Sequence, residues 1–431
     1  MNKSVFVMTV ILLAGLLLSA CGSAAPIAPT QSSQSTSSQE MTMVIGFTES
    51  VTGKQEVTSG KQSKGLRLWM STINKAGGIV LSNGTIIKFK EISFDDESNN
   101  ERVQELYTRL ITNGKADILI SPYSSGMAAS AAVISEQYNK IMITTGAASD
   151  STYTKGYTQV YQIYTPASRY LTGAVDLLKA TDPSIKKVAF VYENDKFSTD
   201  VVTAAKTYAE KLGYEIVLFE GYDSSTSDFA PFINKIQQSG VEAVLGGGHY
   251  PDGSTFARQV FEKSLPIKYF VLLVAPPEPN FTELGDAALG VIGPSQWEPQ
   301  VVFNEKSATQ AGKAWYGITR EEFINLYKTT YAGETPSYHS AGGYAAGLVL
   351  EKAIRNANSS DPAAIKTALD ALDVHTFYGA IQFDTTPKAH GLQIGHSMVY
   401  IQWQKDTTGH LISQVVWPTV GATATLLYPL R

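Results

Sequence analysis

The sequence contains a single cysteine, Cys21, and so cannot form a disulfide within one chain. Positive charge is sparse, with 34 Lys and Arg residues against 39 Asp and Glu residues and no cluster of arginines. A nucleic-acid-binding protein needs a basic patch to neutralise phosphates, so nucleic acid is not an expected partner. Beyond residue 18, no apolar run reaches the length of a transmembrane helix.

The common signatures of enzymes are also missing. The chain has no Gly-x-Ser-x-Gly elbow, no phosphate loop ending in Gly-Lys-Ser/Thr and no His-Glu-x-x-His pair. Gly246-Gly247-Gly248 follows a predicted strand, but Pro251 stands where a dinucleotide fingerprint has its last glycine. His390 and His396 lie near each other without a third metal ligand nearby. We therefore predict no catalytic activity, no metal and no cofactor.

The first 21 residues have the features of a secretory signal. Lys3 precedes an apolar run from Val5 to Leu18 that is too short to span a membrane, and small residues follow. Leu18-Ser19-Ala20-Cys21 resembles the bacterial lipobox, in which the cysteine is acylated. We predict a lipoprotein signal peptide at 1–21, lipidation at Cys21, and a flexible Ser-, Gln- and Thr-rich tether at 22–40. The lipid anchor would be the only attachment to a membrane.

From Met41 onward, short apolar strands alternate with helical segments, which is typical of doubly wound α/β units with parallel sheets. One series begins at the predicted strand 43–47 and another at 188–192. The segment from Met41 to Arg431 is too long for one hydrophobic core, so we predict two doubly wound lobes with a cleft between them. Three late strands, at 380–383, 397–404 and 411–416, should return to these lobes and create a multi-strand hinge.

We place the N-terminal lobe at residues 41–164 plus about 298–392, and the C-terminal lobe at residues 165–297 plus about 393–431. Within the first lobe, residues 48–60 are predicted to be a polar loop before a helix at 61–76. A later helix is predicted at 313–330.

Two successive predicted strands of the first lobe end in small polar residues. The run 118–120 leads to Ser124 and Ser125, and the run 141–143 leads to Ala147, Ala148 and Ser149. Ligands of open α/β sheets bind at the carboxyl ends of the strands. Hydroxyls and free N–H groups at the start of the next helix would form a neutral cradle for a carboxylate. The alternative is that Ser125 is an ordinary N-cap and Ser149 an ordinary loop residue.

Five segments follow one another along the chain in a recognisable order and spacing. They are Ile73-Asn74-Lys75-Ala76-Gly77-Gly78-Ile79, Asp95-Asp96, Gly246-Gly247-Gly248-His249-Tyr250-Pro251, Gly285-Asp286-Ala287-Ala288 and Tyr400-Ile401-Gln402-Trp403. Together they resemble type I periplasmic binding proteins of the leucine/isoleucine/valine-binding class, the receptors of branched-chain amino acid ABC importers. The resemblance covers the whole mature chain.

The resemblance implies ligand contacts on the first lobe. Ser125 would offer its hydroxyl and amide to a carboxylate, while the Ala147 carbonyl and the Ser149 hydroxyl would accept from an ammonium group. Ser124 and Ala148 flank these positions. Thr58 stands where the family often has an aromatic residue, which leaves more room or a more polar wall.

On the second lobe the resemblance assigns contacts to Phe197, His249 and Tyr250, although Phe197 would equally suit a core. Glu278 is the only carboxylate near the family's acidic partner for the ligand ammonium, and it lies in a shorter loop among three prolines. If it points away, the ligand is not an ordinary amino acid, because a bare ammonium would go unpaired. Trp297 would either pack on the ligand or seal the hinge.

The resemblance implies the fold of periplasmic binding protein-like I proteins and a monomeric receptor outside the cytoplasmic membrane. It would bind a small amino acid-like solute by hinge closure and deliver it to ABC permease subunits. Alternatives are a module that signals to a membrane partner, or a receptor for amides, urea-like compounds or aromatic acids.

Overall fold

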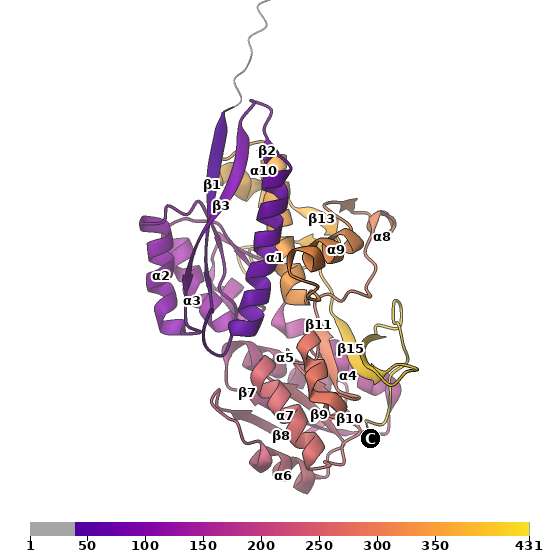
Figure 1. Ribbon diagram of the computed structural model, residues 1–431. Coiled ribbons are helices and arrows are strands. Elements are labelled where there is room, and N and C mark those ends of the chain that lie inside the picture. Colours follow the sequence, from indigo (N-terminus) through magenta and orange to yellow (C-terminus); the bar gives the residue numbers. More distant parts are fainter. Residues whose placement is uncertain (1–38, 431) are drawn as a thin grey trace, which may run out of the picture. The chain divides into compact units, whose positions relative to one another are not determined.

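A computed structural model describes residues 39–430, and two large sheets form its framework (Figure 1). The predicted signal peptide 1–21, its Cys21 and nearly all of the tether 22–40 lie outside the described residues. None of the helices between residues 39 and 430 combines the length and apolar character needed to cross a membrane.

The first sheet has six strands in the order β2-β3-β1-β4-β5-β6, and all neighbours are parallel except β2 and β3. The strands are β1 (Glu40–Glu49), β2 (Ile79–Val80), β3 (Ile86–Asp95), β4 (Ile118–Ile120), β5 (Met142–Thr144) and β6 (Val160–Gln162). Its central strands are buried apolar runs, as expected for a parallel sheet covered on both faces.

Two pairs of helices cover this sheet. On one face α1 (Glu56–Lys75) and α10 (Tyr338–Ala357) pack together and share a core with β1 and β4. On the other face lie α2 (Asn100–Thr112) and α3 (Ser125–Gln137), as Figure 1 shows. The Asn99 side chain caps α2 by accepting a hydrogen bond from the Glu101 N–H, which satisfies a donor that the helix itself leaves unpaired.

The second sheet has seven strands in the order β16-β15-β11-β10-β9-β7-β8, in which β15 and β16 are antiparallel to their neighbours. They are β7 (Lys187–Glu193), β8 (Glu215–Tyr222), β9 (Ala243–Gly247), β10 (Tyr269–Leu272), β11 (Ile292–Ser295), β15 (Val399–Lys405) and β16 (Leu411–Trp417). One face packs on α4 (Thr172–Thr181) and α5 (Lys196–Lys211), the other on α6 (Ala230–Ser239) and α7 (Tyr250–Glu262).

Smaller elements complete the fold. A third sheet joins β12 (Ala314–Trp315), β13 (Asp373–Thr376) and β14 (Gly379–Gln382). The remaining helices are α8 (Glu305–Gln310), α9 (Arg320–Thr330), α11 (Pro362–Asp370) and the 3-10 segments η1 (Asp150–Lys155), η2 (Ala167–Arg169) and η3 (Pro279–Ala287). The chain passes between the two large sheets after β6, after β11 and after β14, which suits a hinge.

The predicted fold class is confirmed, but two predicted elements are wrong. The predicted loop 48–60 is partly helical, because α1 begins at Glu56 and buries Thr58 and Ser59 in spite of their polarity. The predicted helix 313–330 contains a strand and a turn first, and α9 starts only after Thr319, which forms a capping box with Glu322. The lobe boundaries stay a prediction.

Close packing of α1 against α10 depends on glycine. A Cβ atom at Gly65 would lie 1.9 Å from the Ser340 carbonyl oxygen, and one at Gly343 would lie 2.1 Å from the Gln62 carbonyl oxygen. Both distances are far below van der Waals contact, and the obstacles are backbone atoms that cannot rotate away. The two helix backbones therefore approach as closely as they do only because these positions lack side chains.

We predict that Gly65→Ala lowers the free energy of unfolding by about 1–3 kcal/mol, because the added methyl group overpacks the crossing. Gly60→Ala in the same helix is the matched control. Its Cβ would lie 3.9 Å from the nearest atom, so it should stabilise the helix by about 0.5–1 kcal/mol. Denaturant unfolding of both variants measures the difference, and equal stabilities would contradict this account of the crossing.

Candidate functional site

A small cavity lies between the carboxyl ends of the first-sheet strands and the second sheet. The first-sheet side contributes backbone and small side chains from the two predicted turns, namely Tyr123, Ser124, Ser125, Gly146 and Ala148. The second-sheet side contributes Phe197, His249 and Val274, and the remaining wall consists of Tyr164, Tyr170, Tyr338 and His339. The cavity volume is about 10 Å³, which is room for about one water molecule.

The two turns are tied together at Ser125. Its Oγ accepts hydrogen bonds from the backbone N–H groups of Ala148, at 3.0 Å, and Ser149, at 3.1 Å. Both lone pairs are thereby used, so the hydroxyl hydrogen remains for donation. Ser124 precedes it with a φ of 80°, which non-glycine residues rarely adopt. Such backbone strain is frequent in ligand-binding loops, and here it falls on the N-cap residue of α3, which lines the cavity.

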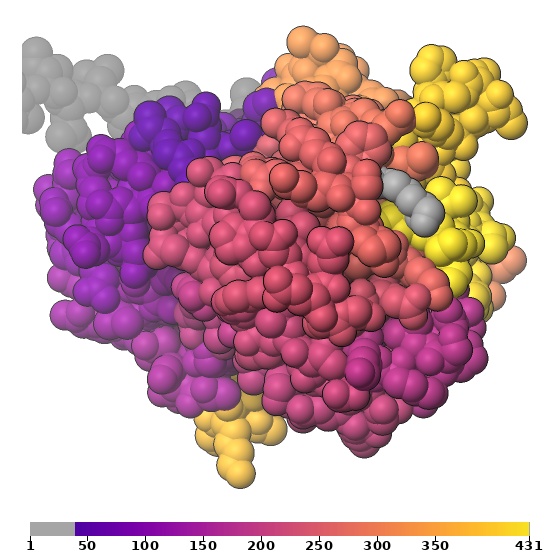
Figure 2. Space-filling model, turned by 90° about the horizontal axis from the view of Figure 1, so that it is seen from below, coloured from indigo at the N-terminus to yellow at the C-terminus, as the bar shows by residue number. Residues whose placement is uncertain are grey.

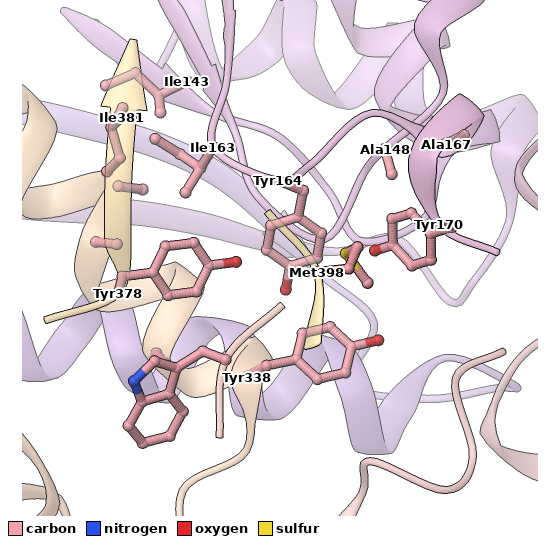
Figure 3. Close-up of a cluster of buried hydrophobic side chains, with 14 of the residues drawn as sticks. Ile143, Ala148, Ile163, Tyr164, Ala167, Tyr170, Tyr338, Tyr378, Ile381 and Met398 are labelled. Carbon is pink, nitrogen blue, oxygen red and sulfur yellow. The ribbon is translucent and has the colours of Figure 1, made fainter. Parts of the chain in front are cut away.

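Aromatic rings form most of the remaining wall. Figure 3 shows Tyr164 between Tyr378 and Tyr170, with Tyr338 facing the same space. The ring centroids of Tyr164 and Tyr338 are 5.7 Å apart. The Tyr164 hydroxyl is buried beside that of Thr145, and neither makes a hydrogen bond to another described residue. A buried donor without a partner costs about 1–3 kcal/mol, so a ligand acceptor at this place would be favoured.

His249 lies at the second-sheet wall, between two polar partners. Its Nε2 is 2.9 Å from Asp195, and its Nδ1 is 3.1 Å from the Tyr123 hydroxyl. Burial alone would lower the pKa of His249, but the nearby carboxylates, Asp195 above all, raise it above its ordinary value. His249 is thus held by a carboxylate on one ring nitrogen and by a hydroxyl of the opposite side of the cleft on the other.

Glu278 is fully buried behind His339. Its two oxygens accept from Lys61 Nζ at 2.7 Å and from His339 Nδ1 at 2.5 Å. Burial would raise the pKa of Glu278, but the charge of Lys61 and the bond from His339 lower it to about 2. Burial lowers the pKa of His339 despite the carboxylate beside it. We therefore read an ionised Glu278, a charged Lys61 and a neutral His339 that donates from Nδ1.

The structure brings together five of the sequence-predicted site residues around the cavity, namely Ser124, Ser125, Ala148, Phe197 and His249. Ala147, Ser149, Tyr250, Glu278 and Trp297 do not line it. The Ser149 hydroxyl donates to Asp200 instead, and Trp297 packs on Phe323 and Phe377 while its ring N–H donates to the Phe377 carbonyl. These contacts favour a role for Trp297 in sealing the hinge over one in packing on the ligand.

Sequence reasoning missed most of the aromatic wall. Tyr123 belongs to the predicted turn, and its bulk beside two serines was a usable signal. Tyr338 and His339 begin α10, far along the chain, and nothing local marks them. Among the described residues, Glu193, Asp195 and His249 lie close enough to ligate a metal, but Lys54 already pairs with Glu193 at 2.6 Å, and Asp195 pairs with His249.

Ion pairs and hydrogen bonds hold the two sides of the cleft together. Lys54, Lys61 and Tyr123 from the first-sheet side reach Glu193, Glu278 and His249 on the second-sheet side. Figure 2 shows one face on which the purple and crimson parts of the chain meet without an opening. The cleft is therefore closed, and a solute larger than water requires the two sides to separate.

Glu298, next to Trp297 in the crossing after β11, is a buried carboxyl group. Its burial, reinforced by the charge of Glu278, raises its pKa from 4.5 to about 8. The folded chain therefore keeps a proton that the unfolded chain has lost, so stability should fall as pH rises from about 4.5 to 8.

The variant Glu298→Gln should remove this dependence, because the amide stays neutral. Above pH 8 its free energy of unfolding should exceed that of the unmodified protein by a few kcal/mol, at about 1.4 kcal/mol per pKa unit. Near pH 4.5 the two should agree. Urea unfolding at a series of pH values measures this, with exposed Glu262→Gln as control. A constant difference at all pH values would contradict the assignment.

Comparison with known proteins places this geometry in context. A family profile described as "Periplasmic binding protein" matches residues 42–408. The Leu/Ile/Val-binding protein homolog 7 of Brucella melitensis is 24% identical over 385 residues, which are 88% of this chain and 92% of that protein.

Two solved structures share the fold. The branched-chain amino acid substrate-binding protein LivJ from Streptococcus pneumoniae, in complex with isoleucine, has a TM-score of 0.71 at 19% identity, covering 88% of this chain and all of that one. A solute-binding protein of an ABC transporter from R. palustris, in complex with benzoate, has a TM-score of 0.71 at 16% identity, covering 90% of this chain and 98% of that one.

Proposed function

The chain belongs to the periplasmic binding protein family, and from this premise we propose that it is the extracytoplasmic receptor that delivers a small carboxylate-bearing solute to an ABC permease. The observation that carries the proposal is the cavity between two sheets, closed by side chains from both. A solute in this position contacts both sides only when they are closed, so its binding favours closure. The permease would then recognise the closed form.

The carboxylate is the feature shared by isoleucine and benzoate, the solutes named for the two similar structures. In this chain a carboxylate would sit at the start of α3. The Ser125 hydroxyl hydrogen, the N–H groups of the first helical turn and the Tyr164 hydroxyl would all donate to it. The aromatic wall would hold the apolar part of the solute.

We also propose that the protein is not an enzyme. A serine nucleophile needs a general base at its hydroxyl. The recorded partners of Ser125 Oγ are instead two backbone N–H groups, which bind its lone pairs rather than withdraw its proton.

We predict that Ser125→Ala weakens solute binding at least tenfold, because the carboxylate loses one donor and the two turns lose their shared bond. Calorimetry with isoleucine, leucine, benzoate and 4-hydroxybenzoate, on protein freed of bound solute by unfolding and refolding, would measure this. Ser130→Ala is the matched control, because Ser130 lies in the same helix and its hydroxyl bonds to Asn100 instead. Equal losses for both variants, or none for Ser125→Ala, would refute the placement of the carboxylate.

We further propose that Cys21 carries the lipid that holds the receptor at the membrane. In a bacterial host, Cys21→Ser should abolish incorporation of radiolabelled palmitate and move the protein from the detergent phase to the aqueous phase of a Triton X-114 partition. Ser19→Thr beside it should leave both readouts unchanged. Continued labelling of Cys21→Ser would show that the lipid is attached elsewhere.

A further inference from the structure

The carboxylate nearest the cavity is already neutralised by the protein itself. Glu278 has no exposed surface, and its oxygens bind Lys61 and His339. Lys61 Nζ has a further acceptor in Asn280 Oδ1 at 2.9 Å. The ammonium group of Lys61 therefore occupies the place beside Glu278 that an ammonium group of a solute would need.

The crossing of α1 and α10 makes this arrangement rigid. Lys61 lies one helical turn before Gly65, and His339 lies one turn before Gly343, the two glycines at which the backbones touch. Side chains one turn apart share a helix face, so both reach the same point, where Glu278 is held. Lys61 is 6% exposed and His339 is 1% exposed, so neither can turn into water.

No other carboxylate is available to a cationic group in the cavity. No Asp or Glu is among the described residues that line it. Asp195 is bound to His249 Nε2 and to the Ser198 N–H, and Glu193, which binds Lys54 through one oxygen only, does not line the cavity. An α-ammonium group closed into this cavity would therefore be buried without a carboxylate of the protein as its partner, which disfavours its binding.

An anionic group, in contrast, meets several donors. The first turn of α3 opens on the cavity, and its N–H groups have no carbonyl one turn earlier in the helix; the Ser124 hydroxyl caps that of Met127, at 3.5 Å. Independently of the helix, Tyr164 lines the cavity and is 2% exposed, and its hydroxyl and that of Thr145, which lie beside each other, make no hydrogen bond to any other described residue. The cavity therefore offers several donors to a negative group and no carboxylate to a positive one.

The walls define the rest of the solute. The rings of Tyr170 and Phe197 lie edge to face with their centroids 5.1 Å apart, and the ring centroids of Phe197 and His249 are 5.8 Å apart. Tyr164 and Tyr338 face the same space from the other side (Figure 3). Faces and edges of rings pack best on a flat aromatic body, and the tyrosine hydroxyls can bond to its polar substituents.

We propose that the solute of this receptor is an aromatic monocarboxylate without an amino group, because Lys61 fills from within the chain the position of a solute ammonium. This inference rests on the proposed function and narrows it. The branched-chain amino acids expected from the resemblance would be poor solutes for the same reason.

Matched pairs that differ only by the ammonium group test the inference directly. The pairs are 3-phenylpropionate with L-phenylalanine, 3-(4-hydroxyphenyl)propionate with L-tyrosine, and 4-methylpentanoate with L-leucine, with benzoate and 4-hydroxybenzoate as further aromatic acids. Calorimetry on the unmodified, solute-free protein should show at least one aromatic acid binding, and each desamino compound binding at least a hundredfold tighter than its amino acid.

Equal or tighter binding of the amino acids would overturn the inference while leaving the proposed receptor function intact. Binding of none of the acids would also overturn it. The receptor function fails separately, if no co-purifying solute is found by mass spectrometry and no solute of any class changes the protein in solution scattering.

The role of Lys61 has its own variant. Lys61→Met frees Glu278, so the preference for 3-phenylpropionate over phenylalanine should fall at least tenfold. Lys64→Met, three residues along in α1, removes a partly exposed lysine that pairs with Glu334, and should leave the preference unchanged. If Lys61→Met does not fold, Lys61→Arg can be measured instead. It keeps the positive charge and should therefore keep the preference for the acid. The affinities of the matched compounds for the unmodified protein test the inference in either case. An unchanged preference in a folded Lys61→Met protein would overturn the role of Lys61.

Discussion

The buried ion pair between Lys61 and Glu278, completed by His339, is the interaction on which the closed cleft depends. It joins α1 and α10 of the first sheet to the loop after β10 of the second. Removing one member of such a buried set costs about 3–5 kcal/mol, because the remaining charge is left without a partner. An exposed pair such as Lys268 with Glu242 contributes little, because water screens its charges. The buried set therefore specifies how the two sides meet, and the surface pairs do not.

Helix packing makes this ion pair attainable. Gly65 and Gly343 allow α1 and α10 to touch through their backbones, and Lys61 and His339 follow from that crossing one turn away. A wider crossing would separate the ammonium group from the imidazole and leave Glu278 half paired in an apolar surrounding. If the proposed solute is correct, the same two glycines couple stability to recognition, since the packing that holds the helices together also keeps Glu278 bound to Lys61 and His339.

The closed form is stabilised both by contacts within the protein across the cleft and by contacts with a bound solute. Lys54 with Glu193, Lys61 with Glu278 and Tyr123 with His249 all span the cleft. A solute shifts the balance toward closure only by the contacts it makes in the closed form and lacks in the open form. In our proposal the start of α3 and the aromatic rings on both sides of the cavity would provide such contacts, and Phe197 and His249 would make theirs only in the closed form.

The sequence by itself determined the alternation of strands and helices, the two sheets, and the turns after β4 and β5 that place Ser124, Ser125 and Ala148 at the cavity. These features are local, because they follow from runs of apolar residues and from the polar residues that end them. Only the tertiary structure decided where α1 begins, which aromatic residues line the cavity, and that Glu278 binds Lys61 and His339. Lys61 lies 217 positions from Glu278, and His339 lies on a helix that no local pattern connects to either. Glu278 is free to bind a solute only if no cation of the protein lies within hydrogen-bond distance of it. The distance between Lys61 and Glu278 is a property of the folded chain and cannot be read from the order of residues.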